Sequence, residues 1–540
     1  MKKIFTTFIF CFSITLCFSQ VGEWVWIHGD SIPNSTGYYG IQGVSSPSNK
    51  PRAVYEACEW TDLNGNFWLF GGTNWNQIPK QEFNDLWKYN PTNNEWTWMK
   101  GSGIGGDLGN YGIQGIPSPI NNPPSRGWGA VSWVDLQGNF WMFGGLKSDS
   151  AYTVYNDLWK YDPITNEWTW MKGPNIPNQP GIYGIIGVPN VLNYPRSRCE
   201  TAISWTDNNG DLWLFGGSDS LDFLNDLWRY NIVTNTWTWM KGSSSGNQPS
   251  FYGTESIEDP ANTPGGRRAY SKWKDDIGNF WLFNGWEYGT SKSDMWRFNP
   301  ITNNWAWMGG DTIINFNGIY GTQCVASTNN VPPVRIESRA VWKDLGGNFW
   351  FYGGYTLFPL NDLWKYCLST QQWTWISGDS TFSFPFVTND WGMLGVSSPS
   401  NKPLPKGGAL GWTNNNVDFY LFGGISGISS FGVYNDLWKY TIDTTCGVCP
   451  TSTNIAEKNS PNHLFIFPNP SSNELIISNF QFQPNDEIII TDVLGEIIFR
   501  KKITEPTANC KLQTANWASG IYFVEVITDE GKVVKKIVKQ

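Results

Sequence analysis

The sequence predicts an all-β protein built around six copies of one four-stranded unit. Three observations lead to this prediction. The chain has 540 residues, too many for one ordinary domain unless a unit repeats. Aromatic residues make up 16% and charged residues 15%, while Gly (57) and Pro (32) supply turns, which suits many short strands and excludes a disordered chain. One motif also returns with a period of roughly 70 residues.

The clearest marker of the repeat is Asn-Asp-Leu-Trp-Lys-Tyr at Asn84–Tyr89. Ahead of it lies an apolar run ending in Phe70-Gly71-Gly72, and Trp60 stands ten residues before Phe70. Related copies of the marker follow at Asn156–Tyr161, Asn225–Tyr230, Ser293–Phe298, Asn361–Tyr366 and Asn435–Tyr440. The spacing within each copy therefore divides the chain into six equivalent units.

Each unit is predicted to hold four strands, which in the first copy are residues 53–60, 67–70, 85–90 and 95–100 (strands a to d). Strand b is apolar on both faces, as expected for a strand between two neighbouring sheets.

Six such units predict a β-propeller, because a linear stack would leave two open sheet edges. The sixth copy lacks strand d, and a spare Trp-x-Trp strand stands at residues 23–29. We therefore predict that the N-terminal strand closes a six-bladed ring.

A Tyr or Phe stands seven positions before a Trp in five copies, as Tyr89 and Trp96 show. Together with the diglycine, this arrangement resembles the Kelch repeat over roughly residues 23–440. The resemblance implies a Kelch-type propeller, like the central domain of galactose oxidase. These units are longer than usual Kelch units, and the excess lies between strands d and a, in segments such as Tyr39–Gly43. Long loops are often functional, so we expect these segments to contribute to function.

Four parts follow one another along the chain. Residues 1–19 have the charged start and short apolar run of an export signal. Residues 20–440 form the propeller and residues 441–462 a polar linker. Residues 463–540, predicted to form a small β-sandwich, resemble the type A C-terminal sorting domain of the bacterial type IX secretion system, on Ile466-Phe467-Pro468-Asn469-Pro470 and the alternating strands after it. The resemblance implies a Gram-negative host of the Bacteroidetes kind, the type IX machinery as a partner, and a secreted or cell-surface location.

Composition excludes several classes of function. The net charge of −9 argues against a nucleic-acid partner, and no segment reaches the length of about 18 apolar residues that a transmembrane helix needs. His28 and His463 are the only two His, which disfavours a His-rich metal site or a Ser-His-Asp triad. We therefore predict no catalytic residue, no metal and no cofactor.

The cysteine pattern predicts no disulfide framework. Nine Cys are present, and two of them, Cys11 and Cys17, leave with the export signal. The remaining seven are an odd number at irregular positions. Cys446 and Cys449 are expected to form a local disulfide or to remain two inert thiols.

Basic residues recur where the chain enters strand a, with Lys406 in the sixth copy. They could form a cationic ring at the channel mouth, suited to an acidic sugar or a carboxylate. They could instead pair between blades with the repeated carboxylates Asp85, Asp157 and their equivalents. The five arginines are Arg52, Arg126, Arg198, Arg267 and Arg335.

Ligand binding is predicted on the propeller face that carries the b–c and d–a connections, because these are long and variable. The b–c loops hold aromatic residues that differ between copies, namely Trp75, Trp286, Tyr288, Tyr355 and Phe358. Exposed aromatics suit sugar stacking or a protein hot spot, although loop packing would also explain them.

We therefore expect a non-catalytic surface protein that binds a glycan or another protein. Two alternatives remain open. One is a carbohydrate-active enzyme resembling Kelch sialate mutarotases, using the arginines with Glu287 or Asp222. The other is a structural component of a surface layer.

Overall fold

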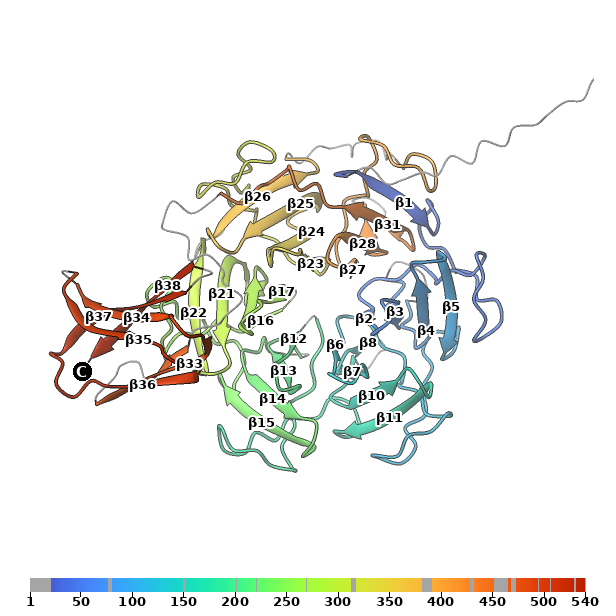
Figure 1. The fold of residues 1–540 in the computed structure, drawn as a ribbon. Coiled ribbons are helices and arrows are strands. Elements are labelled where there is room, and N and C mark those ends of the chain that lie inside the picture. The colour runs from blue at the N-terminus through green and yellow to red at the C-terminus, as the bar shows by residue number, and fades with distance from the viewer. Residues whose placement is uncertain are drawn as a thin grey trace, which may run out of the picture. The chain divides into compact units, whose positions relative to one another are not determined.

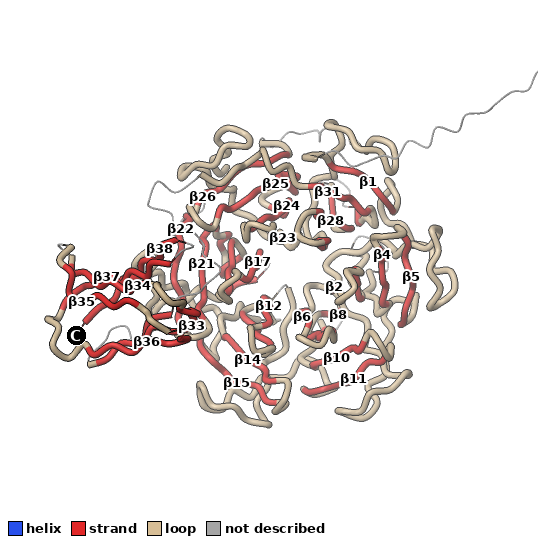
Figure 2. Tube along the Cα trace, viewed as in Figure 1, coloured by secondary structure: helices blue, strands red, loops and turns tan. Residues whose placement is uncertain are grey.

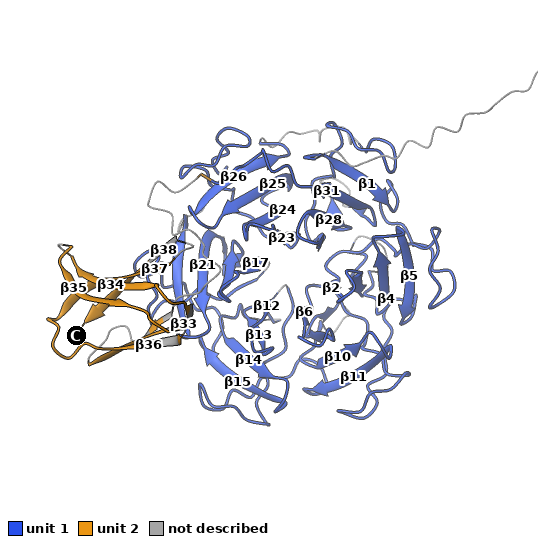
Figure 3. Cartoon of the chain, in the orientation of Figure 1, with its two compact units in different colours: residues 1–449 blue, residues 450–540 orange. Residues whose placement is uncertain are grey.

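The computed structural model describes residues 21–75, 80–148, 152–200, 202–219, 221–268, 270–311, 317–380, 391–427, 432–450, 465–467, 473–493, 495–505, 507–528 and 531–539. The chain forms two compact units, residues 1–449 and 450–540 (Figure 3). The predicted export signal lies outside the described residues.

The first unit contains six four-stranded antiparallel sheets, numbered here as blades one to six (Figure 1). Blade one holds β2 (Cys58–Thr61), β3 (Phe67–Phe70), β4 (Leu86–Asn90) and β5 (Glu95–Lys100). Blade two holds β6 (Val131–Val134), β7 (Phe140–Phe143), β10 (Leu158–Asp162) and β11 (Glu167–Lys172). Blade three holds β12 (Ile203–Thr206), β13 (Leu212–Phe215), β14 (Leu227–Asn231) and β15 (Thr236–Lys241).

Blade four holds β17 (Ser271–Lys274), β18 (Phe280–Phe283), β21 (Ser293–Asn299) and β22 (Asn304–Asp311). Blade five holds β23 (Val341–Lys343), β24 (Phe349–Tyr355), β25 (Pro359–Cys367) and β26 (Gln372–Ser377). Blade six holds β27 (Leu410–Asn414), β28 (Asp418–Phe422), β31 (Leu437–Thr441) and β1 (Trp24–His28). Within the described part of the chain the elements are strands and loops, and Figure 2 shows none as helix.

The N-terminal strand closes the ring, as predicted. β1 pairs antiparallel with β31, so that Trp24 lies opposite Tyr440 and Trp26 opposite Trp438. The innermost strands touch one another in cyclic order from β2 through β6, β12, β17, β23 and β27 back to β2. The six sheets therefore form a closed ring (Figure 1).

The hydrophobic core lies between neighbouring blades. Trp60 of β2 stacks on Phe140 of the next blade, with ring centroids 5.3 Å apart, and its indole N–H donates to the carbonyl of Trp141. The same Trp–Phe stack recurs at four more interfaces. Because Trp→Ala in a core costs about 3–5 kcal/mol, the 34 Trp residues are a main source of stability.

The long segments between strands d and a cover the outer edge of the blade that follows them. In blade one the backbone amide of Gly43 donates to the carbonyl of Trp98 at 2.8 Å, and the side-chain amide of Asn49 donates to the carbonyl of Trp96 at 3.0 Å. The first bond is repeated in the other blades by Gly115, Gly187, Ser256, Cys324 and Gly395. An open edge strand invites pairing with another chain. The extra length of the repeat thus has a structural role that the sequence did not indicate.

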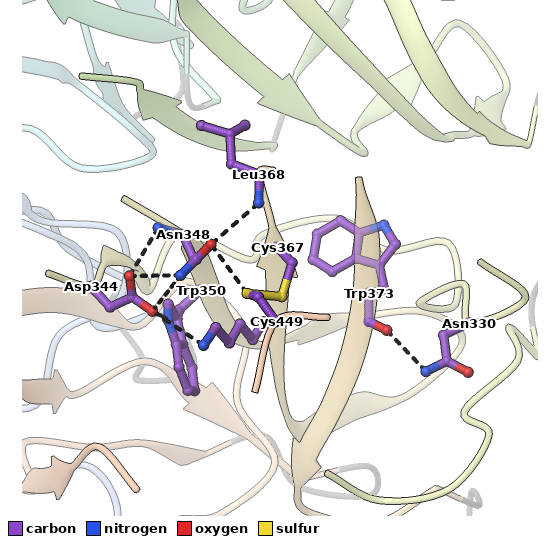
Figure 4. Close-up of a disulfide and its surroundings, with 9 residues drawn as sticks. Asn330, Asp344, Asn348, Trp350, Cys367, Leu368, Trp373 and Cys449 are labelled. Atoms are coloured by element: carbon purple, nitrogen blue, oxygen red, sulfur yellow. Dashed lines mark hydrogen bonds and ion pairs between the residues drawn. A yellow bond between two sulfur atoms is a disulfide. The ribbon is translucent and has the colours of Figure 1, made fainter. Parts of the chain in front are cut away.

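Two disulfides correct the prediction for the cysteines. Cys446 is bonded to Cys324, and Cys449 to Cys367 (Figure 4). Residues 441–449, expected to be linker, therefore belong to the first unit. The prediction failed because the partners are separated by 122 and 82 residues and meet only when the segment after blade six packs against blade five. Cys58, Cys199 and Cys510 are free and buried.

The second unit is a small β-sandwich. One sheet holds β32 (Phe465–Phe467), β33 (Glu474–Phe482) and β36 (Thr507–Gln513). The other holds β35 (Ile497–Lys502), β34 (Glu487–Asp492), β37 (Gly520–Thr528) and β38 (Gly531–Lys539). Leu475 and Ile477 of the first sheet share one buried cluster with Ile488, Val524 and Ile537 of the second. Among the residues described, no helix is long and apolar enough to cross a membrane.

Candidate functional site

One residue from each blade lies at the channel mouth, just before the innermost strand. We call this set the inner rim: Glu56, Trp128, Glu200, Arg268, Glu337 and Gly408. Its members are joined across blades. The amide of Glu200 donates to the carbonyl of Trp128 at 2.6 Å, and the amide of Gly408 donates to the carbonyl of Glu337 at 2.9 Å. Because the rim lies at the start of strand a, it faces the same side as the b–c loops.

The backbone of the inner rim is strained. Glu56, Trp128, Glu200 and Glu337 have φ between 50° and 60°. Such values suit glycine, as at Gly408, and they cost other residues about 1–3 kcal/mol each. Bulky side chains are thus held at the mouth against the local preference of the backbone.

The three glutamates of the rim are electrostatically coupled. Burial raises the pKa of Glu200 to about 7, with Glu56 adding to the rise and Arg268 opposing it. Burial and the charge of Glu56 raise the pKa of Glu337 to about 8, while a hydrogen bond with Tyr55 opposes the rise. Arg268 forms an ion pair with Glu200 at 2.8 Å. The cluster therefore retains a proton at neutral pH.

Two indole rings form a wall beside Glu200. Trp75, from the loop between β3 and β4, meets Trp128 edge to face at a centroid distance of 4.3 Å. The ammonium of Lys80 lies 3.5 Å from the ring centre of Trp75 and 4.2 Å from that of Trp128. Trp75 also packs, together with Tyr355, against a small cluster that contains Tyr55. The structure thus brings two of the five predicted loop aromatics to the mouth.

The channel below the rim is narrow and polar. A cavity of about 20 Å³ is lined by Glu59, Ser132, Ser204, Lys272 and Arg339, among others. Arg339 donates to Glu59 at 2.8 Å, and burial lowers the pKa of Lys272 to about 8. A space of this size holds about one water. This cavity is therefore too small for a sugar or for a side chain of a partner.

Four of the five predicted arginines form buried ion pairs inside their own blade. Arg126 donates through both terminal nitrogens to Asp157, at 2.7 and 2.9 Å, and the side chains of both residues are fully buried. Equivalent pairs join Arg198 to Asp226, Arg267 to Asp294 and Arg335 to Asp362. The arginines pair with the repeated carboxylates, as one of the two interpretations proposed. The pairs differ from that interpretation in one respect, because each lies within one blade and not between two blades. Asp157 and Asp226 come just before the third strand of the sheet that their Arg enters, and Asp294 and Asp362 lie within it.

The remaining two basic residues differ. Lys406 forms a buried ion pair with Asp436, which is equivalent to the arginine–aspartate pairs except that an ammonium replaces the guanidinium. Arg52 is half-buried and donates to the hydroxyl of Tyr39 at 2.9 Å and to the carbonyl of Gly103 at 2.7 Å. Tyr39 in turn donates to Asp85 at 2.6 Å. In blade one a tyrosine therefore stands between the guanidinium and the repeated carboxylate.

The other predicted loop residues lie in blades four and five. Trp286 is half-buried in β19 (Trp286–Glu287), which pairs with β16 (Arg267–Arg268) and so places it opposite Arg268. Tyr288 is 69% exposed, with its ring 6.1 Å from Phe223. Phe358 is half-buried in the turn between β24 and β25.

The carboxylates of the enzyme alternative are engaged in local contacts. Glu287 accepts from the amide and the hydroxyl of Ser250, at 2.9 and 2.6 Å. Asp222 accepts from Arg196 at 3.1 Å and from Asn247 at 2.9 Å. Among the described residues, no group of three His, Cys, Asp or Glu could hold a metal ion.

Sequence reasoning missed Glu56, Glu200, Glu337, Trp128 and Lys80. A signal existed, because the position before strand a is not copied through all six units, whereas the flanking Trp and diglycine repeat. The convergence of these residues could not be seen without the ring closure.

Comparison with known proteins identifies two segments. Residues 208–238 match the Kelch motif, and residues 465–540 match the secretion system C-terminal sorting domain. Both resemblances are thus confirmed for these segments. The sorting domain indicates export through the type IX secretion system to the cell surface or the medium.

Curated relatives are distant. Multiple epidermal growth factor-like domains protein 8 of Homo sapiens is 26% identical over 197 residues, which cover 36% of this chain and 6% of that protein. Kelch domain-containing protein 10 of Bos taurus is 24% identical over 289 residues, covering 45% of this chain and 57% of that protein. The chain thus spans less than two thirds of the length of these relatives.

Proposed function

We propose that this exported Kelch-repeat protein binds a glycan or protein ligand at the inner rim, without chemical turnover. The observation that carries the proposal is the arrangement of Trp75 and Trp128 beside the Glu200–Arg268 ion pair. Aromatic faces next to a small number of polar groups are typical of binding sites. The site also lies where the blades differ from one another, while the surrounding positions repeat.

The test is an array of glycans and host proteins probed with the purified exported protein. We expect at least one ligand whose binding is weakened by Trp75→Ala and by Trp128→Ala. Ile164→Ala is the matched control, because Ile164 is 91% exposed in the turn between β10 and β11, on the opposite face. A ligand whose binding depends on Ile164 and not on the two tryptophans would contradict the proposal.

A second candidate is a carbohydrate-active enzyme at the same rim. It is favoured by the raised pKa values of Glu200 and Glu337, because a general acid must hold a proton near neutral pH. In this version Glu200 and Glu337 replace Glu287 and Asp222 as the acting carboxylates. Turnover of a sugar that is abolished by Glu200→Gln while binding persists would favour the enzyme over the binding protein.

A further inference from the structure

The inner rim already holds an organic cation, which is the side chain of Lys80. Its ammonium lies over two indole rings, 3.5 Å and 4.2 Å from their centres. The faces of aromatic rings attract cations, and tryptophan does so best. The edge-to-face contact of Trp75 and Trp128 leaves one ammonium group held by both rings. We call these two rings the indole cage.

Carboxylates stand beside the cage. The charge of Glu200 acts on Lys80, and Glu82 acts on it more strongly. The bond between the backbone amide of Glu200 and the carbonyl of Trp128 places the backbone of Glu200 next to the cage, and its carboxylate forms an ion pair with Arg268. Glu56 and Glu337 add two carboxyl groups to the same rim, against the single guanidinium of Arg268. A cation is therefore the charge that the cage and its neighbours require.

Desolvation opposes the positive charge of Lys80 in this position. Burial lowers its pKa to about 8, even though Glu82 and Glu200 oppose the change. A lowered pKa means that the ammonium loses more by leaving water than it gains from its new neighbours. A second ammonium loses the same hydration in the cage, so it replaces Lys80 only through the additional contacts that its partner brings.

We infer that the inner rim binds a lysine-type alkylammonium group of a partner protein, in the indole cage that Lys80 occupies in the free protein. The inference rests on the proposed function, because it names the chemistry of a ligand for the same site. A lysine side chain is favoured over an amino sugar because the group seen in the cage is itself an unbranched alkylammonium.

The test removes the internal lysine and supplies small cations. The full exported chain with Lys80→Ala is titrated with n-butylammonium chloride at constant ionic strength, and indole fluorescence and calorimetry report binding. We expect binding about tenfold tighter than in the unchanged protein, where Lys80 competes. Adding Trp75→Ala or Glu200→Gln to Lys80→Ala should weaken it by about five- to thirtyfold. Lys343→Ala, which removes an ammonium on the short-turn face, is the matched control and should behave as the unchanged protein.

Two further probes define the chemistry. n-Butanol has a similar chain without charge, and equal binding of n-butanol would overturn the inference. Tighter binding of butyltrimethylammonium than of n-butylammonium would overturn the assignment to lysine. Absence of n-butylammonium binding to a folded Lys80→Ala protein would also overturn it. If Lys80→Ala lowers the melting temperature, Lys80→Met keeps the length of the side chain, and the same outcomes apply to it.

Failure of the inference and failure of the proposed function are distinguishable. If an array ligand depends on Trp75 but is not displaced by n-butylammonium, the inference is wrong and the proposed function stands. If n-butylammonium binds in the cage but no array ligand depends on Trp75 and Trp128, the proposed function fails and the chemistry of the cage stands.

Discussion

Two sets of charged residues lie a few positions apart before the innermost strands, and they follow opposite rules. The buried arginine–aspartate pairs of blades two to five are nearly identical, fully buried and internally neutral. The inner rim is not copied from blade to blade: it holds Glu in blades one, three and five and other residues in the rest, with strained backbone and unequal charge. The difference teaches that positions copied from blade to blade hold the ring together, whereas departures from the repeat mark the candidate site.

We expect the largest effect on stability from the two disulfides. They do not recur from blade to blade, so they test the rule that only repeated positions hold the ring together. Cys446→Ser with Cys449→Ser removes both disulfides, which close loops of 122 and 82 residues. On the chain-entropy model each such bond contributes about 4–5 kcal/mol, and measured values are often lower. We expect the free energy of unfolding to fall by at least about 4 kcal/mol, measured by denaturant titration. A loss below about 1 kcal/mol would mean that the bonds do not stabilise the closed ring.

The second prediction concerns the repeated pairs. Arg126→Met leaves Asp157 buried without its partner, and breaking a buried ion pair typically costs about 3–5 kcal/mol. The melting temperature should therefore fall, while the affinity of the surviving folded protein for its ligand stays the same. If the affinity fell and the stability did not, the arginines would form an anion site after all, and the comparison would be reversed.

The closed ring and its closing strand could be predicted because Trp-x-Trp, the diglycine and the missing strand d can all be recognised in the sequence alone. The Arg126–Asp157 contact could be proposed but not assigned to one blade, since sequence spacing does not tell which sheet an Asp faces. The disulfides of Cys446 and Cys449 and the rim of Glu56, Glu200 and Glu337 could not be predicted. They depend on residues far apart in the sequence that meet only when the blades pack against one another.

The third prediction sharpens the comparison through pH. The pKa of Glu200 is raised to about 7 and that of Glu337 to about 8. The folded protein therefore holds protons that the unfolded chain releases near pH 4–5, so stability falls as pH rises from about 5 to 8. Glu200→Gln with Glu337→Gln should flatten this decline and raise the melting temperature at pH 8. The melting temperature is measured by calorimetry at pH 5, 6, 7 and 8. An unchanged pH profile in the variant would show that the pKa values of these two glutamates are not raised in the folded protein.

The smallest expected effect on stability is at Trp75, and it separates the two sets most directly. Trp75 is only partly buried and lies outside the repeat, so Trp75→Ala should cost less than about 1 kcal/mol of unfolding free energy. Aromatic contacts contribute about 0.5–1.5 kcal/mol beyond area burial, so its loss should weaken ligand binding by a few-fold to tenfold. Trp159→Ala is the matched control, because Trp159 belongs to the repeated motif and is fully buried. It should lower the free energy of unfolding by about 3–5 kcal/mol and leave the affinity of the folded fraction unchanged. A different result would be an equal loss of stability in both variants with no loss of affinity in either. Trp75 and Trp128 would then contribute packing alone, and the distinction between repeated and varied positions would not extend to function.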